Sequence, residues 1–260
     1  MIEHRFRQSW ANTFLDCPEA ARTQMNGTAV DKTNSSMVRG TVVHEAIEKA
    51  LLARMAGTEF SLEDILSSYD DAWEEHVDEI DFWLEPETKV QEMGALQTQV
   101  WFNEVFPELN PVGVEETFEF TLYQDEKRRI KLHGTRDLDE ESMTWDWKTG
   151  RAKNAWEIRR NNIQSMIYTL ARAHEQQDFE TPQPFTFCHL DKGKLQNIEV
   201  VRTPGDWDSL IPFFINIAEL IEARLPTWPL RYDGWRCSDK WCGNFMNCRG
   251  KHIGSSPSNW

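Results

Sequence analysis

The sequence lacks the features that would place it in a membrane or a secreted scaffold. None of its 260 residues belong to an apolar run long enough to span a bilayer, and residues 1–7 lead into a polar segment rather than the apolar core of a signal peptide. Cysteine is sparse: there are five in all, and an odd number does not fit a disulfide framework. We therefore expect a soluble protein of a reducing compartment that does not contact a membrane.

Basic charge is also scarce. The formal net charge is -15, which on a uniform surface would argue against a nucleic-acid partner. Residues 59–92, however, contain thirteen acidic residues and one lysine, a local balance of -12, so the rest of the chain carries only -3. Residues 148–172 contain six Lys or Arg residues and one Glu. A positive channel away from the acidic segment is compatible with this distribution.

Hydrophobic periodicity predicts an α/β protein, either one elaborated domain spanning residues 1–260 or one domain with a small lobe. Helices are expected at 10–15, 39–55, 155–175 and 206–225, and a group of acidic helices between 57 and 110 is interpreted as an insertion. Strands are expected at 114–123, in a hairpin over 133–150, and in a second hairpin over 185–202.

The hairpin over residues 133–150 reads HGTRDLDEESMTWDWKTG, with a polar turn at 139–142. A period of two puts Asp146 and Lys148 on one face of its second strand. In its first strand, Asp137 follows Gly134, where a missing side chain lets a backbone or ligand come close. Two carboxylates and an amine at paired strands are the groups that divalent-metal phosphodiester chemistry requires. Asp139, two residues nearer the turn, is a minor competing carboxylate.

Other polar residues are ambiguous when taken alone. Gly40 and His44 are four apart on a predicted helix and share a face, but a single histidine there is more often structural than a ligand. Gln164 and Tyr168 have the same spacing and could equally be the polar edge of a core helix or a pair that contacts a nucleotide. Glu115 and Glu116 are adjacent near the start of a predicted strand, and one of them could face the metal site. The alternation of side chains along the strand does not settle which.

Three of the five cysteines lie close together in the tail. Cys237, Cys242 and Cys248 form a C-x4-C-x5-C array with almost no apolar periodicity around it. Closely spaced thiols in a short loop indicate a soft metal centre. Cys188, in contrast, lies inside a predicted strand and is interpreted as a small buried hydrophobe.

Four weak motifs occur in a characteristic order: G-x-x-x-H at 40–44, G-x-x-D at 134–137, D-x-K at 146–148 and Q-x-x-x-Y at 164–168. The ordered set resembles the RecB-like branch of the PD-(D/E)xK nuclease superfamily. Asp-Cys-Pro at 16–18, together with the tail cysteines, resembles the iron-sulfur subset of that branch. This subset includes CRISPR-associated RecB-like exonucleases, AddB-type helicase-nuclease subunits and exonuclease V. The sequence departs from this subset in one spacing. Four residues separate the first two tail cysteines, whereas relatives often have two.

The resemblance implies a restriction-endonuclease-like fold: a mixed central sheet flanked by helices, an acidic helical insertion at 57–110, and a lobe built from residues 226–260 and Cys17. It implies that Mg²⁺ or Mn²⁺ is bound by His44, Asp137, Asp146 and the backbone carbonyl of Trp147. Lys148 is expected to orient or activate the attacking water, and Gln164 and Tyr168 to support the site or contact DNA. A [4Fe-4S] cluster is expected on Cys17, Cys237, Cys242 and Cys248. Zinc, with His252 as a further ligand, is the less favoured alternative.

The function implied is a Mg²⁺- or Mn²⁺-dependent deoxyribonuclease, an exonuclease preferring single strands or free ends, in recombination, repair or phage DNA metabolism. Its expected setting is the cytoplasm of a bacterial or phage-infected cell. A structure-specific endonuclease or end-trimming subunit, and a non-catalytic scaffold that binds DNA ends, are the alternatives. The acidic helices are a solvated face or a surface that docks a protein partner or repels DNA. DNA contacts are expected from the basic residues Arg151, Lys153, Arg159 and Arg160.

Overall fold

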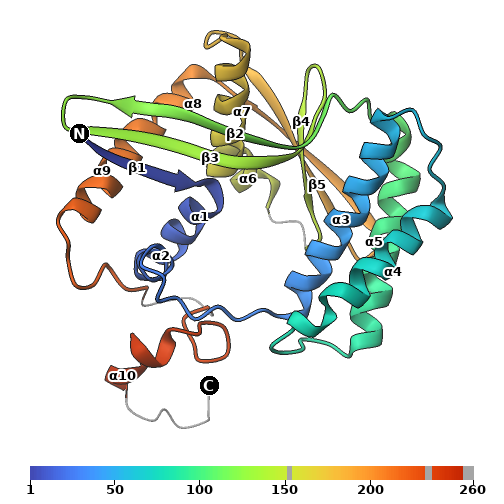
Figure 1. The fold of residues 1–260 in the computed structure, drawn as a ribbon, viewed down its shortest axis with the longest axis horizontal. Coiled ribbons are helices and arrows are strands. Elements are labelled where there is room, and N and C mark those ends of the chain that lie inside the picture. The colour runs from blue at the N-terminus through green and yellow to red at the C-terminus, as the bar shows by residue number, and fades with distance from the viewer. Residues whose placement is uncertain (151–153, 232–235, 254–260) are drawn as a thin grey trace.

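The computed structural model describes residues 1–150, 154–231 and 236–253, and in this part of the chain a mixed six-stranded sheet is flanked by helices (Figure 1). The strands are β1 (Ile2–Arg7), β2 (Gly113–Gln124), β3 (Arg128–Asp139), β4 (Thr144–Lys148), β5 (Gln183–Asp191) and β6 (Lys194–Arg202). Their main path is β1-β3-β4-β5-β6, and β2 pairs with β3 alone. The mixed sheet flanked by helices agrees with the fold expected from the motifs.

The long strand β3 organises the sheet. Along one side it runs antiparallel to β2; along the other it pairs first with β1, in parallel, and then with β4 at residues 138 and 139. β4 and β5 are parallel, and β5 and β6 form an antiparallel hairpin. β1 was not expected, because its six residues carry only two apolar side chains and its partner lies more than 120 residues away.

Five helices precede the second strand. They are α1 (Gln8–Asp16), α2 (Pro18–Met25), α3 (Ser35–Met55), α4 (Leu62–His76) and α5 (Glu87–Glu104), with short 3-10 turns η1 (Val77–Glu79) and η2 (Phe106–Glu108). α4 begins with a capping box in which Ser61 and Asp64 satisfy each other's backbone amides. α4 and α5 pack on α3 through buried aromatic residues such as Tyr69, Trp73 and Trp101. All thirteen acidic residues of segment 59–92 are exposed, so this charge lies on the outer surface.

The helix expected over 155–175 is divided into α6 (Ala155–Asn161) and α7 (Ile163–Gln176). Asn162 interrupts it, and its side chain accepts a hydrogen bond from the amide of Ser165, 3.0 Å away, which caps α7. Near the C-terminus, α8 (Pro204–Asp208) and α9 (Leu210–Glu222) replace a single expected helix, and η3 (Phe245–Asn247) and α10 (Gly250–Ile253) follow. The described helices include none that is both long and apolar enough to cross a bilayer.

Two hydrophobic clusters hold these layers together. The first joins β1, β2, β3, β5 and β6 to α7 and α9, with Phe6, Ile130 and Phe214 among its buried members. The second joins α3, α4 and α5 to the ends of β2, β3 and β5, with Leu138 and Trp147 in its centre. Polar side chains gather where α3, β2, β3, β4 and α7 meet, between these two cores.

Candidate metal centre and cysteine-lined cavity

Helix α3 is positioned to approach the end of β4. Asn34 caps it by accepting hydrogen bonds from the amides of Ser36 and Met37, at 3.0 and 3.2 Å. One and a half turns later, Gly40 faces Thr149: a Cβ at residue 40 would lie 3.0 Å from the Thr149 hydroxyl. The motif glycine therefore serves the close approach of a helix to a strand end.

That approach brings His44 to the paired strands. Its Nε2 lies 2.9 Å from the carbonyl oxygen of Trp147, and because a carbonyl only accepts, Nε2 carries the proton. Its Nδ1 lies 3.4 Å from Oδ2 of Asp137, and the same oxygen accepts a 2.8 Å hydrogen bond from the amide of Trp147. With Nε2 protonated, the Nδ1 lone pair faces a carboxylate, an arrangement that a proton or a cation between them stabilises.

Asp146 is held from two directions. Its side chain is 3 % exposed, and Nζ of Lys148, on the same face of β4, lies 2.5 Å from Oδ2. The other oxygen, Oδ1, accepts a hydrogen bond from Nε2 of Gln164 on α7. The D-x-K and Q-x-x-x-Y motifs thus meet at one carboxylate.

Tyr168 lies one turn further along α7 and is buried. Its hydroxyl is 3.5 Å from Oε1 of Gln8, and its ring packs edge-on against Phe118. A Cβ at Gly134 would lie 2.8 Å from the Phe118 ring, so this glycine leaves room for the aromatic stack. Because Gln164 and Tyr168 are both buried, support of the site fits their geometry better than direct contact with a nucleotide.

Glu115 completes the cluster. Among the described residues, only His44, Glu115 and Asp137 form a group of three His, Cys, Asp or Glu side chains whose ligand atoms all lie within 4.8 Å of one another. Glu115 has φ of +50°, a backbone conformation that non-glycine residues rarely adopt and that is often retained at functional sites. The pairing of β2 with β3 is regular on both sides of Glu115, since Val114 pairs with Leu138 and Glu116 with Arg136, and this register puts Glu115 opposite Asp137.

The carboxylates repel one another. Burial, followed by the nearby charge of Asp146, raises the pKa of Asp137 to about 6. Burial, followed by the charges of Asp137, Glu48 and Asp146, raises the pKa of Glu115 to about 7. Burial lowers the pKa of Lys148, but the adjacent Asp146 and Asp137 outweigh it and the net shift is upward. The site offers one nitrogen ligand and several carboxylate oxygens that repel one another. This set of ligands fits a hard divalent cation such as Mg²⁺ or Mn²⁺.

Asp139 is engaged elsewhere. It accepts hydrogen bonds from Nε of Arg136 at 2.6 Å and from the hydroxyl of Thr144 at 2.7 Å.

Of the expected DNA contacts, Arg151 and Lys153 lie outside the described residues. On α6, Arg159 donates to the carbonyl of Glu199, and the guanidinium of Arg160 stacks 5.1 Å from the ring of Trp156.

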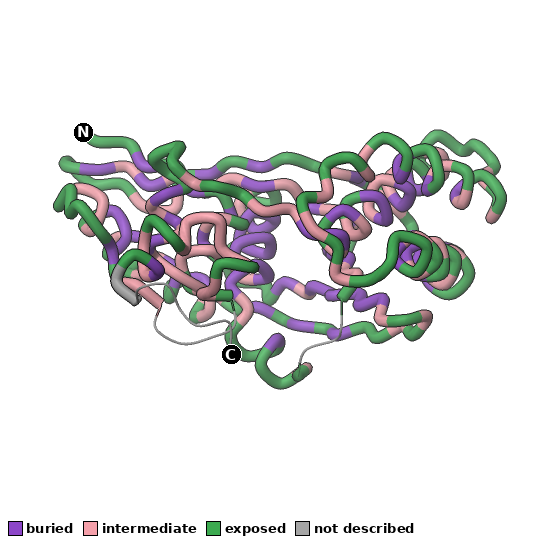
Figure 2. Tube along the Cα trace, turned by 90° about the horizontal axis from the view of Figure 1, so that it is seen from below, coloured by how far each residue is buried: buried purple, intermediate pink, exposed green. Residues whose placement is uncertain are grey.

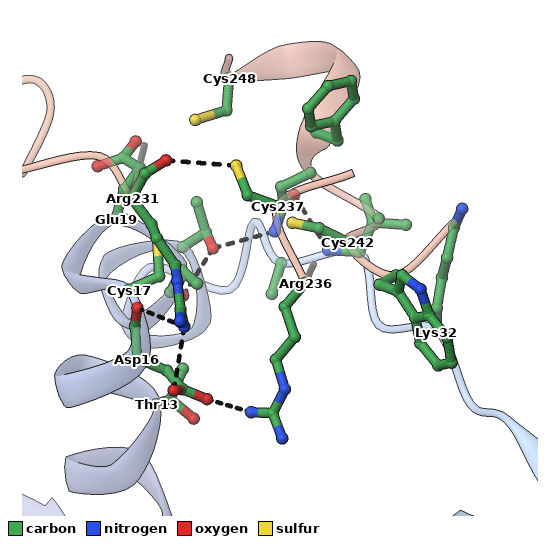
Figure 3. A pocket seen from close by; sticks show the side chains of 18 of the residues that line it. Thr13, Asp16, Cys17, Glu19, Lys32, Arg231, Arg236, Cys237, Cys242 and Cys248 are labelled. Carbon is green, nitrogen blue, oxygen red and sulfur yellow. Dashed lines mark hydrogen bonds and ion pairs between the residues drawn. The ribbon is translucent and has the colours of Figure 1, made fainter. Parts of the chain in front are cut away.

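The four cysteines expected to act together line one cavity of about 500 Å³ between α1, α2 and the C-terminal segment (Figure 3). Among the described residues, no three of their sulfur atoms all lie within 4.8 Å of one another, whereas the ligand atoms of His44, Glu115 and Asp137 do. Burial, and then repulsion from Cys17 and Cys237, raises the pKa of Cys242. Cys188 is fully buried in a different place, as expected for a hydrophobe, and the His252 side chain lies outside what the structure describes.

The two ends of the chain are also joined without the thiols. Asp16 forms ion pairs with Arg231 and Arg236. The amide of Trp228 donates to Oε2 of Glu19 at 2.7 Å. These contacts attach the C-terminal segment to α1 and α2.

Comparison with known proteins adds to this geometry. Residues 5–249 match the family model of the PD-(D/E)XK nuclease superfamily. The fold is similar to a crystal structure from Eubacterium rectale described as a "putative exonuclease", with a TM-score of 0.57, 10% identity, and coverage of 97% of this chain and 90% of that one. The structure of SSO0001 is less similar, with a TM-score of 0.42, 13% identity, and coverage of 79% of this chain and 95% of that one. No curated protein matches the sequence.

Proposed function

Because this chain belongs to the PD-(D/E)XK nuclease superfamily, we propose that it is a DNA nuclease that requires Mg²⁺ or Mn²⁺. The observation that carries the proposal is the convergence of His44, Glu115 and Asp137 from α3, β2 and β3, beside the ion pair of Asp146 and Lys148 on β4. Apart from Glu115, these are the residues that the ordered motifs assign to the reaction. The fold neighbour described as an exonuclease is compatible with it.

We propose that the cation is held by His44, Asp137 and Asp146, by the Trp147 carbonyl, and additionally by Glu115. Their separation along the chain means that no single element can form the site. When bound, the cation polarises the scissile phosphate and lowers the pKa of a water toward neutrality. The chain's own contribution is to hold these carboxylates close together in a fixed arrangement.

Lys148 is proposed to act as a cation rather than as a base. Two neighbouring carboxylates favour its protonated form, and a protonated amine can donate hydrogen bonds to the attacking water and to the phosphate oxygens. Gln164 positions Asp146 by donating to the oxygen that Lys148 does not contact. Tyr168 keeps α7 against β2 and β3 through its contact with Phe118.

The substrate is proposed to be DNA with a free, single-stranded end, so that the enzyme acts as an exonuclease. This preference rests on the resemblance of the motifs to RecB-like exonucleases. An endonuclease would cleave circular single strands as fast as linear ones, and a non-catalytic scaffold would cleave neither. Comparing linear and circular single strands in Mg²⁺ therefore distinguishes the three functions.

The test of catalysis uses Asp146→Ala and Lys148→Ala. Each is expected to lower the digestion of end-labelled DNA by at least about 100-fold, because each removes a group that acts on the developing charge. Asp70→Ala and Lys89→Ala, at exposed positions on α4 and α5, are matched controls and should digest DNA like the parent. Parental rates for the two site variants would reject the proposed site.

The cysteine-lined cavity is proposed to hold a [4Fe-4S] cluster on Cys17, Cys237, Cys242 and Cys248. Four thiols around one cavity, all of them free, support this choice, as does the reducing cytoplasm that we propose for the protein. The segment also touches the loop that leads to α3, since Gly243 lies too close to Val30 to accommodate a Cβ. Loss of the cluster is therefore expected to disturb α3 and the His44 that it carries.

The acidic surface of α4, η1 and α5 is proposed to dock a protein partner with basic character. All thirteen acidic side chains are exposed, and such a surface repels DNA phosphates and favours cations. Asp70→Asn, Asp71→Asn, Glu74→Gln and Glu75→Gln, combined in one variant, should weaken capture of such a partner and leave digestion of naked DNA unchanged. Parental capture by this variant would reject the docking surface.

A further inference from the structure

The outer face of β3 carries a row of polar side chains that ends at Asp137. Residues two apart on a strand share a face, so Arg129, Lys131, His133 and Thr135 lie on the same side of β3 as Asp137. All five are partly exposed, and the β3 residues between them are buried. Figure 2 shows this alternation in the strands that run from the N-terminus along the upper outline of the molecule, with helices below them.

β1 extends the row sideways. Its register with β3 places Arg5 beside Lys131 and Arg7 beside His133. At the end of β1, a hollow of about 410 Å³ is lined by Arg5, Arg7 and His133 on the strand side and by α1 and α2 on the other. Trp10 and the exposed Met25 contribute apolar surface to this hollow. It therefore combines positive charge with an aromatic ring, as single-strand binding sites do.

The part of this face away from the metal centre is locally basic on an acidic protein. There, the acidic partners of Arg5, Arg129 and Lys131 are Glu3 and Glu119. The ion pairs between them are partly exposed, and exposed pairs contribute little stability, so phosphate groups can compete for the cations. Among the described residues, the side chain of Arg7 has no hydrogen-bond or ion-pair partner. Burial first, and then Arg5 and Arg7, lower the pKa of His133, as a positive local potential would.

The spacing suits a strand that emerges from the metal centre. At about 3.3 Å per residue, His133 lies roughly 13 Å and Lys131 roughly 20 Å from Asp137 along β3. We propose that this face binds the phosphate backbone of a single DNA strand whose cleaved phosphodiester lies at Asp137, with Arg7 contacting one phosphate and the neighbouring Arg5 and Lys131 contacting the next. The proposal rests on the nuclease function above and specifies where its substrate lies.

Arg7→Gln is the sharpest test, because this side chain has no protein partner to disturb. Binding of a labelled single-stranded oligonucleotide is measured with Ca²⁺ in place of Mg²⁺, over a series of salt concentrations. Arg7→Gln should bind several-fold more weakly, and the slope of log affinity against log salt should become shallower by about 0.7, the loss of one phosphate contact. Arg224→Gln is the matched control: it is exposed at the end of α9, which packs on the opposite face of the sheet.

Hydrolysis of bis(p-nitrophenyl) phosphate separates this proposal from the nuclease function, since a small diester reaches only the metal centre. Arg7→Gln should hydrolyse it at the parental rate while digesting long strands more slowly. A parent that hydrolyses neither substrate would contradict the nuclease function itself. Parental binding and salt slope for Arg7→Gln, together with losses for Arg159→Gln and Arg160→Gln, would instead place the strand across α6 and overturn the proposal.

Discussion

His44 and Trp147 are 103 residues apart in the chain, and Nε2 of the first lies 2.9 Å from the carbonyl oxygen of the second. This contact joins α3, which belongs to the helical core, to β4, which carries Asp146 and Lys148. The amide of the same Trp147 donates to Asp137, so one residue contacts two of the proposed metal ligands, His44 and Asp137.

Replacing Gln164 should lower activity without unfolding the protein. In Gln164→Glu the side chain keeps its size, but it no longer donates to Asp146 and places a second negative charge beside it. A residue that orients a metal ligand typically contributes about 10- to 100-fold to activity or metal affinity. Steady-state digestion and Mn²⁺ titration calorimetry should both show such a loss, with circular dichroism unchanged. Gln196→Glu, exposed on β6, should retain parental values; equal activity in the two variants would contradict the assigned role.

In the metal-free protein, the stability that Asp137 and Glu115 contribute should fall as pH rises from about 4 to about 7. The folded chain raises the pKa of Asp137 to about 6 and of Glu115 to about 7, so these two groups bind more protons in the folded than in the unfolded chain in this window. Their contribution to the free energy of unfolding must then fall with pH. For Asp137 alone, the shift corresponds to about 3 kcal/mol.

The measurement is the difference in unfolding free energy between the parent and Asp137→Asn, which removes the contribution of carboxylates elsewhere. The parent should become less stable relative to the variant as pH rises. Mn²⁺ affinity of the parent should change in the opposite direction and increase through the same window, because binding requires ionised carboxylates. A parent-to-variant difference that stays constant with pH would show that Asp137 is not perturbed.

Cys17→Ala should abolish the cluster, and Cys188→Ala should not. Anaerobically purified parent is expected to be brown and to contain iron, and the Cys17 variant to be colourless. The Cys188 variant loses a thiol that is fully buried away from the cavity, so it should keep the colour. Iron and zinc analysis of all three proteins is the readout. A colourless parent with stoichiometric zinc would reject the iron-sulfur assignment.

Two glycine substitutions should behave in opposite ways. Gly40→Ala gains up to about 1 kcal/mol of helix propensity, which offsets the crowding of the Thr149 hydroxyl, so stability should be nearly unchanged. Activity should nevertheless fall, because the end of β4 next to Lys148 must shift by a few tenths of an ångström. Gly94→Ala should destabilise by at least about 1–3 kcal/mol, since the new Cβ would lie 2.7 Å from ring atoms of buried Tyr69. Thermal melts and digestion rates distinguish the two effects.

The hairpin and the helical site motifs were predictable from local spacing, but several boundaries were not. Asn162 divides a helix whose apolar stripe is continuous, because its side chain competes for the backbone amide of Ser165. β1 escaped prediction since its strand identity depends on residues 128–133 rather than on its own six. Glu115 could not be assigned because its place opposite Asp137 depends on the register between β2 and β3, which the sequence of β2 alone does not specify.

The sequence by itself determined which groups can share a face: a period of two pairs Asp146 with Lys148, and a spacing of four pairs Gly40 with His44 and Gln164 with Tyr168. These relationships are local, so they follow from the geometry of one strand or one helix. Only the tertiary structure decided how the pairs meet. Three features depend on contacts between elements far apart in the chain, which no local period specifies. They are the contact of His44 with Trp147, the position of Glu115 beside His44 and Asp137, and the row of basic residues beside Asp137.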